Sequence, residues 1–224
     1  MTTTRLHRTA SRAFSAVLLA CATSALLAGG ALGATQEDKA EFSVKAGSLS
    51  FSSTPSMPAL KEVTLTGGSQ TTNTTMTNFG AQDATGSGSG WNVTVAGQSG
   101  SEKSAVFAQY CPTATCGTDV KGYVAAGAAL PAGSLTLNST GATFSAQNGS
   151  TGTAPTLQCA ASCNIDSASA VKIASGAEKA GMGTWLTTGF SATSLALATS
   201  STLKALANGE IYRVNLLWTL STGP

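Results

Sequence analysis

Apolar and polar side chains alternate near the C-terminal end of the 224-residue chain, in the segment IYRVNLLWTL at positions 211–220. Successive side chains of an extended segment point to opposite faces of a sheet. We predict an interior strand that packs its apolar face against a second layer, because burying a large apolar side chain contributes roughly 1.5–3 kcal/mol. That face carries Tyr212, Val214, Leu216, Trp218 and Leu220.

The same alternation occurs in GWNVTVAG at positions 90–97, after a stretch rich in glycine and serine. Trp91, Val93 and Val95 share one face of this segment, and Asn92 and Thr94 share the other. We predict a strand at 91–96. The two tryptophan-containing strands are expected to lie in or beside the core, near each other.

Short runs rich in Val, Thr, Leu and Phe fill the rest of the chain, and turn signals such as GGSQ, NFG and QNGS separate them. Helical periodicity is nearly absent. This pattern is typical of an all-β sandwich, and we predict an immunoglobulin-like β-sandwich with long insertions that carry disulfides. A short helix is expected at 200–206, with Leu203 and Leu206 facing inward. Further strands are predicted at 41–44, 49–52, 62–66, 72–79, 103–109, 134–137, 156–158, 171–174 and 184–187.

Leu206, Gly209 and Tyr212 have the spacing of the corner that opens a late strand in immunoglobulin-like sandwiches. In such a corner the tyrosine hydroxyl donates a hydrogen bond to the backbone a few residues upstream. We predict this role for Tyr212, with Gly209 in the turn before it. The alternative is a half-buried tyrosine whose hydroxyl is hydrated.

Two Trp-x-aliphatic motifs bracket the chain: Trp91-x-Val93 follows TGSGSG, and Trp218-x-Leu220 lies close to the C-terminus. In their order, separation and glycine-rich approach these motifs resemble the WxL domain of Gram-positive surface proteins, over residues 42–224. The first motif departs from the family pattern, since Val93 stands where the family usually has Leu. The resemblance implies non-covalent binding to peptidoglycan or another cell-wall glycan, often alongside surface proteins that carry membrane or wall anchors.

The resemblance makes Trp91, Val93, Trp218 and Leu220 candidate binding residues. Trp185 joins them because the glycine-rich segment GMGTWLTTGF favours an exposed indole that could stack on a sugar. The alternative is that the indoles fill the core, since a tryptophan that alternates with aliphatic residues normally faces inward. We therefore expect the motifs to act on wall binding mainly indirectly, by shaping a surface that meets glycan or peptide.

Residues 1–34 have the pattern of an export signal: a basic start, an apolar stretch at 13–27 and small residues before a cleavage expected after Gly33 or Ala34. An uncleaved anchor and lipidation at Cys21 are the alternatives. We expect residues 35–224 to form one secreted domain with no membrane attachment after cleavage. Because the end of the chain, STGP, carries no sorting motif, we expect its attachment to the cell surface to be non-covalent.

The basic charge of the chain belongs to this leader. The whole chain has a net charge of +2, and the leader holds Arg5, Arg8 and Arg12 but no acidic residue, so the remainder has a net charge of about −1. No basic patch remains that would indicate nucleic-acid binding.

Four cysteines follow the leader, Cys111 and Cys116 in one pair and Cys159 and Cys163 in another. An even number of cysteines in an exported chain favours disulfides. We predict the two local pairings among the three that are possible, and their short loops would stiffen two insertions. A zinc site built from all four cysteines is the alternative.

Catalytic chemistry has few candidates in this sequence. The single histidine, His7, lies in the leader, so a Ser–His–Asp or Cys–His arrangement is excluded after cleavage. We expect neither an enzyme nor a cofactor. A carboxylate pair of the glycoside hydrolase kind is an alternative, although no local spacing singles one out. The ten carboxylates are Glu37, Asp38, Glu41, Glu62, Asp83, Glu102, Asp119, Asp166, Glu178 and Glu210.

A second class of function is also open. A structural adhesin or an assembly subunit acts through protein–protein contact. Such a protein would present exposed strand edges or an apolar patch on its surface.

Overall fold

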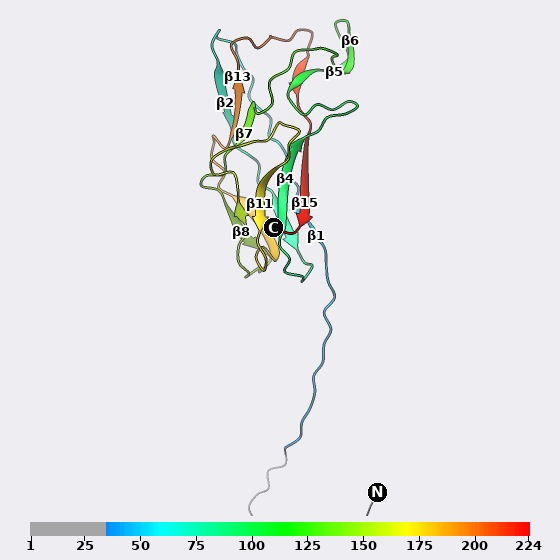
Figure 1. Cartoon of the computed structure of the whole chain (residues 1–224), viewed down its shortest axis with the longest axis vertical. Helices are drawn as coiled ribbons and strands as arrows, with labels where there is room; N and C mark the ends of the chain where they lie inside the picture. Colours follow the sequence, from blue (N-terminus) through cyan, green and yellow to red (C-terminus); the bar gives the residue numbers. More distant parts are fainter. Residues whose placement is uncertain (1–34) are drawn as a thin grey trace, which may run out of the picture. The chain divides into compact units, whose positions relative to one another are not determined.

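The computed structural model describes residues 35–224 (Figure 1), so the predicted export signal at 1–34 lies outside the described residues. The chain divides into two units, of which the first ends at Ser43. The described part of the first unit, residues 35–43, is exposed and has no regular secondary structure. The second unit, residues 44–224, holds every strand described below. Within residues 35–224 no helix has the length and hydropathy that a membrane crossing requires.

The second unit is built from short antiparallel strands, and the all-β prediction is confirmed. The strands are β1 (Leu49–Ser53), β2 (Gln70–Thr74), β3 (Gly80–Asp83), β4 (Trp91–Gly97), β5 (Ala108–Cys116), β6 (Asp119–Tyr123), β7 (Leu135–Leu137), β8 (Thr143–Gln147), β9 (Thr156–Leu157), β10 (Cys163–Asn164), β11 (Val171–Gly176), β12 (Gly183–Thr188), β13 (Leu195–Thr199), β14 (Ile211–Arg213) and β15 (Leu216–Thr222).

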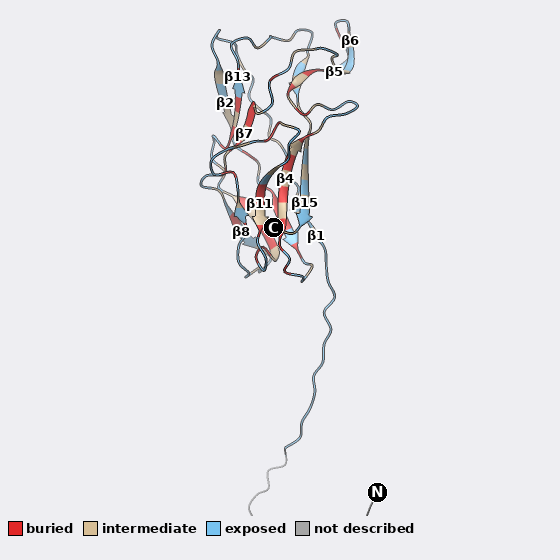
Figure 2. Ribbon diagram, viewed as in Figure 1, coloured by how far each residue is buried: buried red, intermediate tan, exposed pale blue. Residues whose placement is uncertain are grey.

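These strands form four sheets with the orders β1-β3-β12-β8, β10-β7-β13-β2, β15-β4-β11-β9 and β14-β5-β6. The arrangement is consistent with the predicted immunoglobulin-like sandwich. Figure 2 shows that buried residues concentrate along β4 and β11, in the third sheet. Sheets that each hide one face explain why hydrophobic residues alternate with polar ones along β4.

Phe79 lies at the centre of the core, just before β3. Its ring centroid is 6.2 Å from that of Phe144, 6.4 Å from that of Phe190 and 6.2 Å from that of Trp218. The Trp91 ring meets Phe144 edge-on at 6.1 Å. Aromatic pairs in this range are favourable beyond their burial, so this cluster joins segments that are far apart in the sequence.

The predicted strand at 211–220 is divided near Asn215, and its two parts, β14 and β15, join different sheets. The backbone N–H of Asn215 donates to the Ser104 carbonyl oxygen at 2.9 Å, and its own carbonyl oxygen accepts from the Gln98 N–H at 2.8 Å. Its side-chain oxygen accepts from the Tyr123 hydroxyl at 2.6 Å. These partners come from other segments, so the strand changes sheets where they hold it.

The prediction of an interior strand is wrong for β15, which lies at the edge of its sheet with β4 as its one neighbour among the described strands. The predicted face still packs against the core, where Trp218 and Leu220 are half-buried. Leu217, on the opposite face, is exposed.

The helix predicted at 200–206 is wrong, because the described residues contain no helix there. The segment begins with a turn in which the Leu203 N–H donates to the Ser200 carbonyl oxygen at 3.2 Å. A run of this length is too short to hold a helix without tertiary support. Leu203 does face the core as predicted.

Several strand boundaries also differ from the prediction. Residues 41–44 and 62–66 form no strand, the strand predicted at 72–79 ends at Thr74, and the one predicted at 103–109 begins only at Ala108. The strands β3, β6, β8, β10 and β13 were not predicted.

Both local disulfides are confirmed. Cys111 is joined to Cys116 and Cys159 to Cys163, with S–S distances of 2.11 and 2.19 Å. The first spans an irregular stretch of β5, where the register against β6 shifts. The second closes the turn that leads into β10.

Candidate functional site

The two Trp-x-aliphatic motifs lie near each other, as predicted, and the structure places them on adjacent strands. β15 pairs antiparallel with β4, and the register places Leu220 opposite Val93 and Trp218 opposite Val95. Residues directly opposite each other lie on the same face of a sheet. The motif side chains therefore form one continuous inner surface of this sheet.

Trp91 is fully buried. Its indole N–H donates to the Gly181 carbonyl oxygen at 3.0 Å. A Cβ at Gly181 would lie 2.7 Å from the indole nitrogen, and the φ angle of +72° at this position also favours glycine. The glycine-rich segment near Trp185 thus serves to receive Trp91, and Trp91 and Val93 have no surface to offer a ligand.

The expectation that Trp185 is exposed is wrong. Its side chain is only 4% exposed, and its indole N–H donates to the Met182 carbonyl oxygen at 2.9 Å. It stands on β12 and contributes to the core. Among the three tryptophans only Trp218 is partly accessible, because β15 is an edge strand.

The outer face of this sheet carries two rows of polar side chains, and we call these side chains the polar sheet face. The register of β15 with β4, of β4 with β11 and of β11 with β9 shows which of these side chains lie opposite each other on neighbouring strands. One row consists of Ser221, Asn92, Ser175 and Thr156, and the other of Thr219, Thr94 and Lys172, with Gln158 beside the first row.

Hydrogen bonds hold the first row in place. The Ser221 hydroxyl donates to the Asn92 side-chain oxygen at 3.3 Å, and the Gln158 amide donates to the hydroxyls of Ser175 at 2.9 Å and Thr156 at 3.0 Å. With neighbouring strands about 4.8 Å apart, a row across four strands spans about 14 Å. The face therefore offers an ordered, mostly exposed array of hydroxyl and amide groups with one ammonium group.

Sequence reasoning found only part of this face. The alternation in 90–97 places Asn92 and Thr94 opposite the buried residues, and the same reading of 216–222 would have added Thr219 and Ser221. In 171–176 strict alternation would separate Lys172 from Ser175, and both lie on this face because the register against β4 shifts between Lys172 and Ala174. The order in which the strands pair has no local signal in the sequence. Because that order decides which polar residues lie side by side, the two rows could not be predicted.

The Tyr212 corner that the sequence predicts is present. The Tyr212 hydroxyl donates to the Lys204 carbonyl oxygen at 2.8 Å, and Gly209 has a φ angle of +78° in the turn between them. Burial raises the pKa of the Tyr212 hydroxyl. The corner holds the segment before β14 against the rest of the unit.

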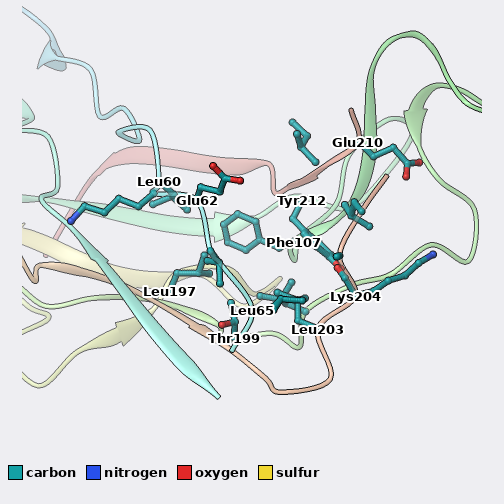
Figure 3. A pocket seen from close by; sticks show the side chains of 16 residues that line it. Leu60, Glu62, Leu65, Phe107, Leu197, Thr199, Leu203, Lys204, Glu210 and Tyr212 are labelled. Carbon is teal, nitrogen blue, oxygen red and sulfur yellow. The ribbon is translucent and has the colours of Figure 1, made fainter. Parts of the chain in front are cut away.

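An apolar pocket of about 500 Å³ lies beside this corner (Figure 3). Phe107 is at its centre, and Figure 3 shows the charged ends of Lys204 and Glu210 directed away from that ring. The amide of Gln109 donates to Glu210 at 2.9 Å. The pocket is lined by Leu60, Lys61, Glu62, Val63, Leu65, Phe107, Leu130, Leu197, Thr199, Leu203, Lys204, Ala205, Leu206, Glu210, Ile211 and Tyr212.

Among residues 35–224 no group of three or more His, Cys, Asp or Glu side chains is placed to hold a metal ion. All four cysteines of this part are in disulfides, which leaves no thiolate ligand there for the zinc alternative.

Asp166 is a fully buried carboxylate, and neither of its oxygens has a hydrogen-bond partner within the hydrogen-bonding distance among the described residues. Burial raises the pKa of Asp166, while backbone amides around Leu135 and Gly133 oppose the shift. A carboxyl group whose pKa is raised on folding binds its proton more tightly in the native state. Its contribution to the free energy of unfolding is fully present below the pKa that this carboxyl group has in the unfolded chain. That contribution is lost as the pH rises through the pKa of the group in the folded protein.

We therefore expect the free energy of unfolding to decrease with rising pH on the acid side, by at most about 1.4 kcal/mol per pH unit from this group. The variant Asp166→Asn is expected to flatten that part of the profile. Urea denaturation of both proteins between pH 3.5 and pH 7, roughly the range around an aspartate pKa, measures the difference. Parallel profiles for the two proteins would contradict the assignment.

Comparison of the chain with protein-family models, curated proteins and solved structures finds no match. The resemblance to the WxL domain therefore rests on the two motifs and on their place in the chain.

Proposed function

We propose that the chain is an exported, non-catalytic binding domain that attaches non-covalently to the Gram-positive cell wall, with the polar sheet face as its contact surface. The observation that carries the proposal is the pairing of the two motifs on β4 and β15. One arrangement of strands buries the motif residues on its inner face and presents the polar rows on its outer face.

The chemistry of the polar sheet face supports a glycan or peptidoglycan partner. Hydroxyl and amide side chains both donate and accept hydrogen bonds, as sugar hydroxyls and peptide groups do. None of the eight side chains of the face is aromatic, so recognition there would depend on hydrogen bonds instead of stacking. The ammonium group of Lys172 adds a positive charge that suits anionic groups of a wall polymer.

In this proposal the tryptophans position the contact surface and do not touch the wall. Trp91 is closed off by Gly181 and Phe144, and Trp218 packs its ring toward Phe79. Each holds the inner side of a strand whose outer side carries Asn92 or Thr219. Replacing either tryptophan would therefore shift its strand, and the shifted strand would weaken binding to the wall.

A pelleting assay with purified Gram-positive sacculi tests the proposal. The folded chain is expected to sediment with sacculi in a saturable manner, and chain unfolded by heat and reductant serves as the control. Sacculi stripped of teichoic acids and accessory glycans show which polymer is bound. A folded chain that stays in the supernatant with every preparation would contradict wall attachment.

A further inference from the structure

The segment Glu41-Phe42-Ser43-Val44-Lys45 has the alternation of a half-buried strand but no partner. It forms no regular structure, and the side chains of Phe42 and Val44 are 91% and 83% exposed. No backbone–backbone hydrogen bond of this segment is present within residues 35–224. Two large apolar side chains that alternate on a free, extended segment are suited to adding a strand elsewhere.

A second segment, 62–66, also has the alternation of a strand and forms none. Val63 and Leu65 line the apolar pocket, and Leu65 is 41% exposed although it is a large apolar residue. The described residues provide no backbone–backbone hydrogen bond to this segment. It is therefore a segment with the side-chain pattern of a strand, beside an apolar pocket, whose backbone has no strand partner.

One hydrogen bond shows which edge of this segment is free. The side-chain amide of Gln70 donates to the Thr64 carbonyl oxygen at 3.0 Å. In an extended segment the backbone groups of neighbouring residues point to opposite sides. If Thr64 faces Gln70, the backbone groups of Val63 and Leu65 face the other way, where an added strand can pair.

We propose that residues 41–45 of one copy of the chain bind as an antiparallel strand along residues 62–66 of a second copy, with Phe42 and Val44 seated in the apolar pocket. One antiparallel register places the apolar residues of the two segments opposite each other. It sets Phe42 opposite Leu65, Val44 opposite Val63 and Lys45 opposite Glu62. Opposite-charge and apolar cross-strand pairs each favour such a pairing.

Another copy is favoured over the chain's own pocket. Val44 precedes β1, and Figure 1 shows β1 at the other end of the second unit from β2 and β13. The pocket is lined from β13 and β14. The contact joins two different surfaces, so it is heterologous and repeats from copy to copy, which yields open chains of subunits unless a ring closes.

Sedimentation velocity of the purified chain over a wide range of concentrations tests the proposal. The chain is expected to form dimers and longer species as its concentration rises. Phe42→Asp places a charge on the inserted segment, and Leu65→Asp places one in the pocket. Each is expected to weaken self-association by about tenfold to a hundredfold, since the loss of one buried large apolar side chain changes the affinity by about this factor. Both residues are exposed, so neither change removes a core contact.

Val120→Asp is the matched control, because Val120 is an apolar residue of β6 that is 73% exposed and lies outside the pocket. It is expected to leave self-association unchanged. An equimolar mixture of Phe42→Asp and Leu65→Asp proteins restores one complete contact, so the mixture should form a heterodimer while each variant alone stays monomeric. A synthetic peptide of residues 35–48 should inhibit the assembly of the unaltered chain.

Several results would overturn the proposal. A chain that stays monomeric at every concentration would do so, and so would association that both variants retain. A mixture that remains monomeric would show that the segment covers the pocket of its own chain or acts elsewhere. Binding of lauric acid to the pocket that the peptide does not displace would assign the pocket to a lipid.

Discussion

Replacing Trp91 by alanine is expected to lower the free energy of unfolding by about 3–5 kcal/mol. The indole is fully buried, meets Phe144 edge-on and donates to the Gly181 carbonyl oxygen. Its removal leaves a cavity and an unpaired carbonyl group beside a glycine that has no side chain to fill the space. Urea denaturation followed by intrinsic fluorescence measures the loss.

Trp218→Ala is the matched control, because Trp218 belongs to the second motif and is half-buried on an edge strand. Replacing Trp218 by alanine is expected to lower the free energy of unfolding by roughly 1.5–2.5 kcal/mol, about half the loss expected for a fully buried tryptophan. The Trp218→Ala protein should therefore remain folded at room temperature. If its loss of stability exceeded that of Trp91→Ala, the assignment of the first motif as the main anchor of the sheet would be wrong.

The double change Lys172→Glu with Thr219→Glu is expected to weaken binding to sacculi by about tenfold to a hundredfold and to leave thermal stability nearly unchanged. Both residues flank Thr94 in the same row of the polar sheet face, and both are exposed. The change removes two hydrogen-bonding groups, each worth about 0.5–1.5 kcal/mol, and reverses the charge of the face. Titration of sacculi in the pelleting assay gives the ratio of affinities.

The matched control carries Lys121→Glu and Thr118→Glu, which alter the charge by the same amount at exposed positions of β6 and of the turn before it. This protein should bind sacculi as the unaltered chain does. Equal losses of affinity in the two double variants would show that net charge governs binding and that the polar sheet face is not the contact surface.

Alternation along single strands predicts the centre of the fold well. The reading of Trp91, Val93 and Val95 as one buried face is correct, since all three are fully buried. It succeeds because β4 pairs on both sides and has one buried face along its whole length, so side-chain burial follows the period of two.

The errors arise where distant segments decide the local structure. The strand predicted at 211–220 is divided because Asn215 bonds to Gln98, Ser104 and Tyr123, none of them near it in the sequence. Trp185 is buried although its glycine-rich neighbourhood indicates exposure, because its strand β12 pairs with β3 on one side and β8 on the other, and its ring packs in the core. Such contacts leave no periodic signal in the sequence.

The strands predicted at 41–44 and 62–66 fail for a different reason. Their alternation is real, but neither segment has a strand partner within residues 35–224. A strand pattern is satisfied only by pairing, and the proposed contact between two copies would supply the partner that the single chain lacks.

The most direct test of the central claim is to map where the wall meets the domain. Amide chemical shifts of the isotopically labelled chain are recorded as soluble peptidoglycan fragments are added. Contact through the polar sheet face predicts saturable shift changes concentrated at Asn92, Thr94, Lys172, Thr219 and Ser221, with smaller changes on the buried side of the same strands. Changes confined to the apolar pocket, or none with any wall fragment, would contradict it.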